Sequence, residues 1–245
     1  MEALPSGTLS GAPRDLEVIA GRITALTEVA EPVLCPEISL RLATPNTPMW
    51  TAGQAQLDAW GCPEPYWAFA WPGGQTLGRA LLDHPELVRG KSVLDLGSGG
   101  GIAALCALRA GARAAHAVDI DPWASVAVRL GCQLSQLPSE KLTTSAQDLI
   151  GQPVNEEVLL VGDLLYEAEL AARLLPWLKA QAQRGVLVCI GDPGRGHVDL
   201  SALERVASYL APTDAGLDGS TLKEASVYRL GAYFTSVGQP ETICT

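Results

Sequence analysis

From residue 92 onward, hydrophobic positions follow two patterns that alternate along the chain. Short, nearly continuous apolar runs predict buried strands, and they occupy residues 92–96, 114–119, 157–162 and 185–191. Residues 142–145 are predicted to form a further short strand. Apolar side chains at helical spacing occupy residues 102–110, 122–136 and 167–183 between these runs. Strands separated by helices are typical of βαβ units, which build parallel sheets.

The C-terminal part is predicted to add a helix at residues 200–210 and strands at residues 223–230 and 232–235. Together with the five earlier strands, these elements predict an α/β fold. We expect a Rossmann-like, mostly parallel sheet of seven strands with helices on both faces.

An N-terminal extension precedes this unit. Residues 15–30 have helical spacing, residues 38–42 alternate as in a strand, and residues 50–71 hold four tryptophans and two prolines. We expect the tryptophan-rich stretch to form a cap. The chain is therefore divided into an extension and cap at 1–60, a main domain at 61–235 and a tail at 236–245.

Charge and the length of the apolar stretches indicate which kinds of partner the protein binds. The net charge is −10 and no lysine or arginine cluster is present, so we expect no nucleic-acid partner. The acidic balance suits a basic or lysine-bearing partner, and solubility alone explains it equally well. Apolar stretches are too short to cross a bilayer, so no membrane partner is expected. We expect a monomer.

Six cysteines stand in the chain without C-x-x-C spacing. Zinc and dithiol redox motifs are therefore not expected, and no metal site is predicted. The first residues show neither a secretory signal nor an evident mitochondrial presequence.

A glycine-rich turn follows the strand at residues 92–96. Asp95, Gly97, Gly99 and Gly101 occupy alternate positions there. Glycines let the backbone turn tightly and approach a ligand closely. This spacing differs from the G-x-G-x-x-G pattern of dinucleotide sites, and a carboxylate at Asp95 would repel a pyrophosphate. It suits the cationic amino-acid part of S-adenosylmethionine, which favours a methyltransferase over a dehydrogenase.

Acidic residues also stand at or after the ends of the next two strands. Asp119 lies about 20 residues after the glycines, where a carboxylate can accept from both ribose hydroxyls. Asp121 precedes Pro122 and is better interpreted as the N-cap of the following helix. Asp148 follows the third strand and is assigned to the adenine amino group, with an ordinary loop aspartate as the alternative.

Asp163 and Tyr166 follow the fourth strand and are the predicted catalytic residues. Lysine has a pKa of about 10.4 and must lose a proton before it accepts a methyl group. Asp163 is expected to hold the incoming ammonium group, and Tyr166 to form part of an apolar channel that lowers the lysine pKa by desolvation. Proximity and alignment would supply the remaining catalysis. The alternative for Asp163 is an N-cap of the next helix.

Five segments of the sequence resemble the electron-transfer flavoprotein β-subunit lysine methyltransferases, a branch of the seven-β-strand methyltransferases. They are Glu64–Gln75, Val88–Gly99, Asp119–Pro122, Gly162–Tyr166 and Ile190–Arg195. The resemblance extends from about residue 36 to residue 230. The blocks around Trp71 and around Pro193 are more specific than the glycine motif. Gly100 departs from the family pattern, where Cys or another small residue is expected.

The resemblance implies an S-adenosylmethionine-dependent enzyme that methylates lysines of the electron-transfer flavoprotein β subunit. It implies that Asp163 and Tyr166 form the family's Asp-x-x-Tyr motif, that Trp71 lines the cofactor pocket and that Gly162 lines the adenosine site. The compartment would be the mitochondrial matrix, or the cytoplasm for a bacterial protein.

Three alternatives remain at this stage. Asp119–Pro122 also resembles enzymes that modify ribosomal protein L11. A non-catalytic scaffold that binds the cofactor is the second alternative, although Asp95, Asp119 and Asp163 are all present. The third is a nicotinamide oxidoreductase, for which no proton-relay residue is found.

Overall fold

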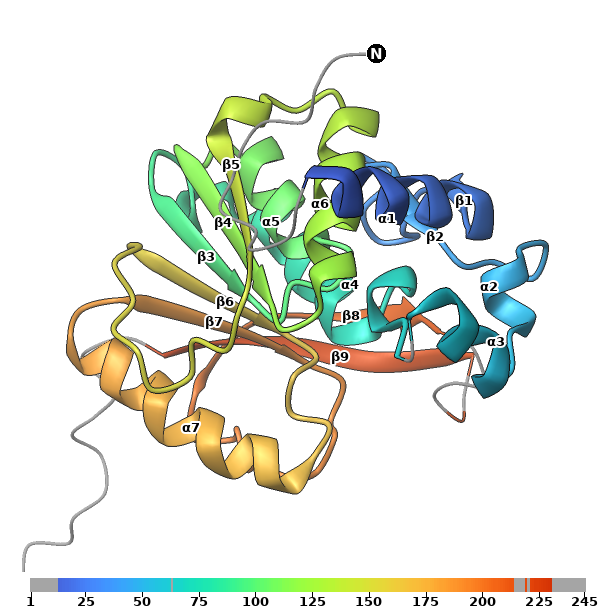
Figure 1. Cartoon of the computed structure of the whole chain (residues 1–245). Coiled ribbons are helices and arrows are strands. Elements are labelled where there is room, and N and C mark those ends of the chain that lie inside the picture. The colour runs from blue at the N-terminus through green and yellow to red at the C-terminus, as the bar shows by residue number, and fades with distance from the viewer. Residues whose placement is uncertain (1–12, 63, 214–218, 220, 231–245) are drawn as a thin grey trace, which may run out of the picture.

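A computed structural model describes residues 13–62, 64–213, 219 and 221–230 of the 245-residue chain. Its centre is a seven-stranded sheet with the order β5-β4-β3-β6-β7-β9-β8 (Figure 1). The strands are β3 (Ser92–Leu96), β4 (Ala114–Asp119), β5 (Leu142–Ala146), β6 (Val158–Gly162), β7 (Leu187–Asp192), β8 (Glu204–Pro212) and β9 (Leu222–Leu230). The first five run parallel, and β9 is antiparallel to both β7 and β8. This arrangement confirms the predicted mostly parallel sheet of seven strands.

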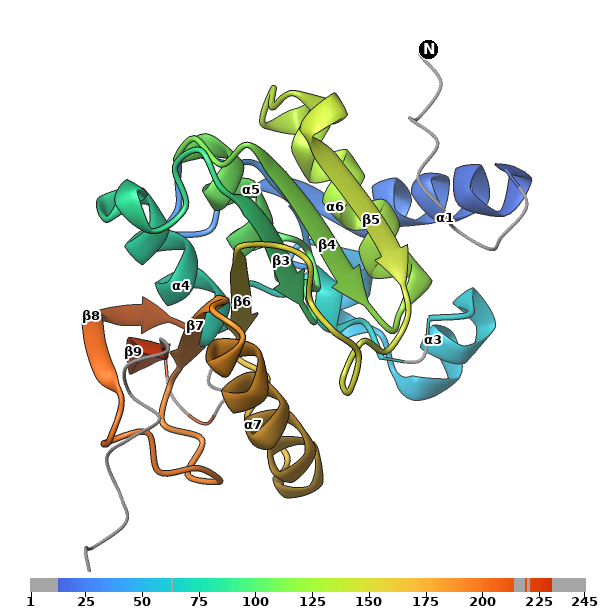
Figure 2. The ribbon, with the colours of Figure 1, turned by 90° about the vertical axis from the view of Figure 1, so that its left-hand side faces the viewer.

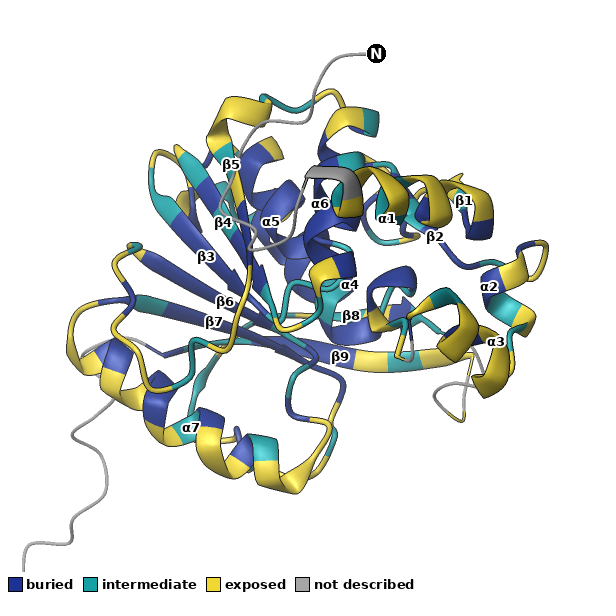
Figure 3. Cartoon of the chain, viewed as in Figure 1, coloured by how far each residue is buried: buried dark blue, intermediate teal, exposed yellow. Residues whose placement is uncertain are grey.

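Helices cover both faces of the sheet, as predicted. On one face lie α4 (Pro72–Asp83), α5 (Ile102–Arg109) and α6 (Pro122–Leu134), while α7 (Ala168–Gln183) covers the other (Figures 1 and 2). Alternate residues of a strand serve the two faces. Val93 packs in the core under α4 and α5, and its neighbour Leu94 packs in the core under α7. The central strands are therefore buried on both sides (Figure 3), which explains their continuous apolar sequences.

The N-terminal part packs against α6. It consists of α1 (Pro13–Leu26), β1 (Glu28–Ala30), β2 (Leu40–Leu42), α2 (Pro48–Thr51), α3 (Gln54–Trp60) and the short 3₁₀ helix η1 (Tyr66–Ala68). Ile23 of α1 and Trp67 of η1 are buried in one cluster with Trp123 of α6. The rings of Trp67 and Trp123 stack with centroids 5.8 Å apart. The predicted cap is thus fixed to the helix that begins just after β4.

Two elements differ from the prediction. Residues 28–30 form β1, which pairs with β2, so the helix predicted for residues 15–30 ends at Leu26. The helix predicted for residues 200–210 is wrong, because most of this segment is β8. Its apolar positions suit a helix, but hydrogen bonds to β9 along the whole strand override that preference. Leu210, which would lie on the apolar face of the helix, is exposed.

A helix of the main domain was not predicted, and two predictions fall on residues that the structure does not describe. Helix α4 has no counterpart among the predicted elements, although Pro72 is a typical first residue of a helix. The predicted strand at 232–235 and the boundary at residue 235 lie outside the described residues. Within the described part of the chain, none of the helices is long and apolar enough to span a membrane.

Candidate active site

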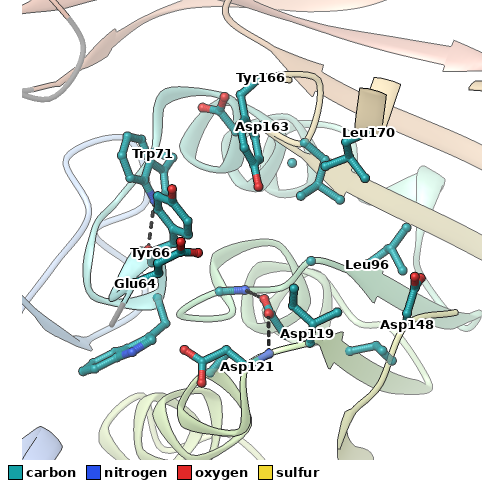
Figure 4. A pocket seen from close by; sticks show the side chains of 18 of the residues that line it. Glu64, Tyr66, Trp71, Leu96, Asp119, Asp121, Asp148, Asp163, Tyr166 and Leu170 are labelled. Atoms are coloured by element: carbon teal, nitrogen blue, oxygen red, sulfur yellow. Dashed lines mark hydrogen bonds between the residues drawn. The ribbon is translucent and has the colours of Figure 1, made fainter. Parts of the chain in front are cut away.

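A cavity of about 600 Å³ opens at the carboxyl ends of the parallel strands. Residues after β3, β4, β5 and β6 form one part of its wall, and the cap adds Glu64, Tyr66 and Trp71 (Figure 4). This is the edge of an open α/β sheet at which ligands bind. Eight of the ten predicted site residues line the cavity, and Asp95 and Gly101 do not.

Gly97, Gly99 and Gly101 form the turn between β3 and α5. Their φ values are 62°, 49° and 85°, in the left-handed region that favours glycine. A Cβ on Gly97 would lie 2.5 Å from the side chain of Leu164, and one on Gly101 would lie 2.7 Å from Val128. Gly97 and Gly99 therefore bring bare backbone to the cavity, whereas Gly101 allows α5 and α6 to pack closely.

Asp95 lies beneath this turn and not in the cavity. Asp95 is only 2% exposed, and its Oδ2 accepts a hydrogen bond from the backbone N–H of Ala104 at 2.9 Å. Burial raises the pKa of Asp95 to about 7, with a further contribution from the negative charge of Asp119. The predicted direct contact with a cationic ligand is not supported by this position, and the carboxyl group instead ties the end of β3 to α5.

Asp119 holds the turn from the neighbouring strand. Its Oδ2 accepts from the N–H of Gly99 at 2.8 Å, and its Oδ1 accepts from the N–H of Asp121 at 3.0 Å (Figure 4). A carboxylate offers about four acceptor positions, so each oxygen keeps one for a ligand hydroxyl. Asp121 is the N-cap of α6, as interpreted from the sequence, and accepts from the N–H of Trp123. Burial raises the pKa of Asp121 to about 6.

Asp148 lines the cavity and is already tied to α7. Its Oδ2 lies 2.7 Å from Nη2 of Arg173, and its Oδ1 accepts from the N–H of Ile150. The ion pair with Arg173 holds the pKa of Asp148 below its usual value. The side chain is half-exposed, so an acceptor position on it remains open to a ligand.

Asp163 has the most constrained position in the site. Its φ is 59°, which is uncommon for a residue other than glycine. Its Oδ2 accepts from the N–H of Gly73 at 2.8 Å, and its Oδ1 accepts from Nε of Arg195 at 2.7 Å. Burial raises the pKa of Asp163, and Arg195 and Gly73 counteract that rise. Helix α7 begins at Ala168 with Glu167 as its N-cap, so Asp163 is not the cap of that helix.

Three aromatic rings lie beside Asp163. The ring centroid of Tyr66 is 6.0 Å from that of Trp71 and 6.1 Å from that of Tyr166. The indole Nε1 of Trp71 donates to the carbonyl oxygen of Tyr66 at 2.9 Å, which fixes both residues (Figure 4). In the same view Asp119 and Asp121 lie across the cavity from Asp163. The cavity therefore has an aromatic end, which holds the carboxyl groups of Asp163 and Glu64, and an acidic end at the glycine turn (Figure 4).

Close backbone contacts explain other small residues of the site. Gly162 lines the cavity, and a Cβ on it would lie 3.0 Å from Cα of Gly74. A Cβ on Gly100 would lie 2.7 Å from the carbonyl oxygen of Trp67. The departure from the family pattern at Gly100 thus matches the close approach of the cap to the turn.

Sequence reasoning missed the contributions of Gly73, Tyr66 and Arg195. Each meets Asp163 or Tyr166 from a segment far away in the chain, so no local spacing reveals the contact. Arg195 ends one of the segments that carry the family resemblance, and its position beside Asp163 was not predicted. Within the described residues, no group of three or more His, Cys, Asp or Glu side chains is placed to hold a metal ion.

The strand order, the glycine turn and the acceptor positions left open on Asp119 fit the nucleoside part of S-adenosylmethionine. Together with the relatives described next, they define the chain as an S-adenosylmethionine-dependent methyltransferase of the Rossmann-like class. The chain is 41% identical over 208 residues to the electron transfer flavoprotein beta subunit lysine methyltransferase of Xenopus laevis, covering 82% of each protein. The human protein of that name is 40% identical over 201 residues, covering 80% of this chain and 75% of the human one. The chain belongs to this family and is a protein-lysine methyltransferase.

More distant similarities were also found. The family model described as Ribosomal protein L11 methyltransferase (PrmA) matches residues 80–184. The ribosomal protein L11 methyltransferase of Geobacter metallireducens is 37% identical over 86 residues, which cover 34% of this chain and 29% of that protein. A solved RNA methyltransferase from Salinibacter ruber in complex with S-adenosyl-L-homocysteine is 18% identical, covers 69% of this chain and 95% of its own, and has a TM-score of 0.46.

Proposed function

We propose that this enzyme methylates lysine side chains of the electron transfer flavoprotein β subunit. The observation that carries the proposal is the aromatic end of the cavity, where Tyr66, Trp71 and Tyr166 surround the carboxylate of Asp163. A lysine has a long apolar stem and a cationic head, and this end of the cavity offers a surface for each. Relatives about 40% identical over most of their length carry the flavoprotein subunit in their names.

The two ends of the cavity are assigned different roles. Asp119 would accept from ribose hydroxyls, Asp148 would face the adenine, and Gly97, Gly99 and Gly162 would leave room for the nucleoside. S-adenosylmethionine supplies the methyl group for an in-line displacement. Asp163 would accept one hydrogen bond from the acceptor nitrogen and align it with the methyl donor.

The acceptor lysine must arrive at the donor as a neutral amine. The aromatic walls and the burial of Asp163 remove water from the ammonium head, which lowers the lysine pKa. Asp163 opposes this effect because a carboxylate favours the charged form. We therefore assign Asp163 to capture and orientation, and the aromatic side chains to desolvation. The methylation rate should rise with pH as the amine loses its proton.

The cellular compartment of the enzyme is inferred from that of its acceptor protein. We propose that the protein works where the flavoprotein subunit is found, in the mitochondrial matrix or, in a bacterial cell, in the cytoplasm. We further propose a monomer that takes a folded protein as its substrate and has no nucleic-acid or membrane partner. The carboxyl groups of Glu64, Asp119 and Asp121 on the cavity wall suit a positively charged, lysine-bearing partner.

The acceptor is tested by methyl transfer from labelled S-adenosylmethionine to purified flavoprotein β subunit, with purified ribosomal protein L11 as the competing acceptor. We expect label on the flavoprotein subunit at a rate at least ten times that on L11, and we expect peptide mass spectrometry to place it on lysine. Equal labelling of the two proteins, or label on L11 alone, would contradict the assignment of the acceptor.

A further inference from the structure

The segment after β7 forms a tight turn that is organised by Asp192. The Oδ2 of Asp192 accepts from the N–H of Gly194 at 2.7 Å and from the N–H of Arg195 at 3.3 Å. Gly194 and Gly196 have φ values of 77° and 81°, and a Cβ on either would meet no atom within 4 Å. Packing by neighbours therefore does not explain these glycines, and the turn depends on its own backbone and on Asp192.

The turn directs Arg195 inward to the cavity. Its side chain is only 16% exposed, and Nη2 as well as Nε lies 2.7 Å from Oδ1 of Asp163. The N–H of Gly73, at the start of α4, occupies one acceptor position on the other oxygen. Asp163 thus connects the ends of β6 and β7 with the first turn of α4.

A count of acceptor positions shows what remains for a ligand. A carboxylate has about four. Arg195 uses the two on Oδ1, and Gly73 uses one of the two on Oδ2. A single position on Oδ2 is left, which matches one N–H of an incoming amine.

The other charged groups near Asp163 do not replace Arg195. Asp192 is negative and disfavours the ionised form of Asp163. Lys223 of β9 lowers the pKa of Asp192. The other titratable residues labelled at this end of the cavity carry no positive charge, and they are Glu64, Tyr66 and Tyr166 (Figure 4). Burial alone would favour a protonated Asp163, and a protonated carboxyl group holds an ammonium only weakly.

We propose that Arg195 is a positioning residue for methyl transfer: the turn built on Asp192 brings its guanidinium to Asp163, which it holds as an anion with one acceptor position turned to the incoming lysine. This inference rests on the proposed function, because it presumes that Asp163 meets the acceptor. The segment Gly191–Arg195 thereby has a part in catalysis, although Arg195 itself does not touch the substrate.

The test compares wild type with Arg195→Met and Arg195→Lys over pH 6.5–9.5, with calorimetry as a check that cofactor affinity is retained. We expect Arg195→Met to lower kcat/KM for the acceptor protein at least ten-fold at pH 7. The deficit should shrink as the pH rises, because Asp163 then ionises without help. Arg195→Lys should keep most of the wild-type profile. A loss that is the same at every pH, or no loss, would overturn the proposal.

A double-mutant cycle separates positioning from a general loss of structure. Arg195→Met combined with Asp163→Asn should be no slower than Asp163→Asn alone, whereas additive losses would contradict an action through Asp163. Arg113→Met is the matched control, since Arg113 pairs with Glu157 on the surface, at the amino end of β4. It should leave the profile unchanged.

One readout requires no acceptor at all. In protein with ¹³C-labelled aspartate carboxyls, nuclear magnetic resonance should give a higher pKa for Asp163 in Arg195→Met than in wild type. An unchanged pKa overturns the inference. If the wild type fails to label the flavoprotein subunit while this shift is seen, the proposed acceptor is wrong and the action of Arg195 on Asp163 stands.

Discussion

The acidic side chains at the carboxyl edge of the sheet differ in how far each one is buried. Asp95 is closed off under the glycine turn, Asp119 spans the turn and the cavity, and Asp163 faces the cavity from a buried backbone position. From their places at the ends of buried strands, the sequence predicts a ligand contact for each of these three residues. Burial and hydrogen-bond partners instead separate a residue that supports the turn from two that can meet a ligand.

Asp95 gives a prediction for stability. Its pKa of about 7 in the folded protein is above its ordinary value of 3.8, so its favourable contribution is complete below about pH 4 and is lost as the pH rises through 7. The free energy of unfolding of wild type, measured with urea, should therefore fall relative to that of Asp95→Asn by about 2 kcal/mol between pH 5 and pH 8. Asparagine keeps an acceptor for the N–H of Ala104 and carries no charge.

The control for this comparison is Asp58→Asn, which removes the same charge from an exposed position on α3. Its curve of stability against pH should run parallel to that of wild type. Parallel curves for Asp95→Asn would show that the buried carboxyl group does not titrate in this range.

At the scale of elements, the sequence predicts the buried central strands better than the strand at the edge of the sheet. The bounds of β3 and β4 agree with the apolar runs at 92–96 and 114–119, because strands buried on both faces have few polar residues. Strand β8 could not be recognised in this way, since it lies at the sheet edge with partly exposed positions, and its pairing with β9 depends on a distant segment.

The same reasoning applies to the site. Asp119 and Asp163 were predictable because each ends or directly follows a buried strand, and the carboxyl ends of parallel strands meet at one edge. Tyr66 and Arg195 were not predictable as partners of Tyr166 and Asp163. Their contacts depend on where the cap and the turn after β7 fold back onto the sheet.

The cap element carries its own prediction. Tyr66 is about half-exposed and contacts the rings of Trp71 and Tyr166, so Tyr66→Ala should cost little stability. It removes one aromatic wall, and aromatic and cation–π contacts contribute about 1 kcal/mol each. We expect KM for the acceptor protein to rise about five- to ten-fold in steady-state methylation assays. Tyr66→Phe keeps the ring and should behave as wild type, and an equal effect of both variants would assign the role to the hydroxyl group instead.

At the scale of the whole molecule, the N-terminal cap and the sheet meet where the cavity opens. Helix α6 joins them, because its first residues border the cavity after Asp121 and its side carries the cap through Trp123. The cap supplies part of the aromatic end, while the sheet supplies the acidic end. Binding of the methyl donor and capture of the lysine are therefore assigned to different parts of one cavity, and a single substitution should affect one without the other.

The measurement that tests this account most directly compares wild type with Asp163→Asn. Asparagine tolerates the left-handed backbone at this position, so the fold should be retained. Methyl transfer to the flavoprotein β subunit and calorimetric binding of S-adenosylmethionine are measured on the same samples. We predict that Asp163→Asn loses transfer by about a hundred-fold or more, as expected for removal of a charged orienting group, while its cofactor Kd changes less than three-fold. Transfer at the wild-type rate, or the joint loss of transfer and cofactor binding, would contradict the placement of Asp163 at the acceptor end.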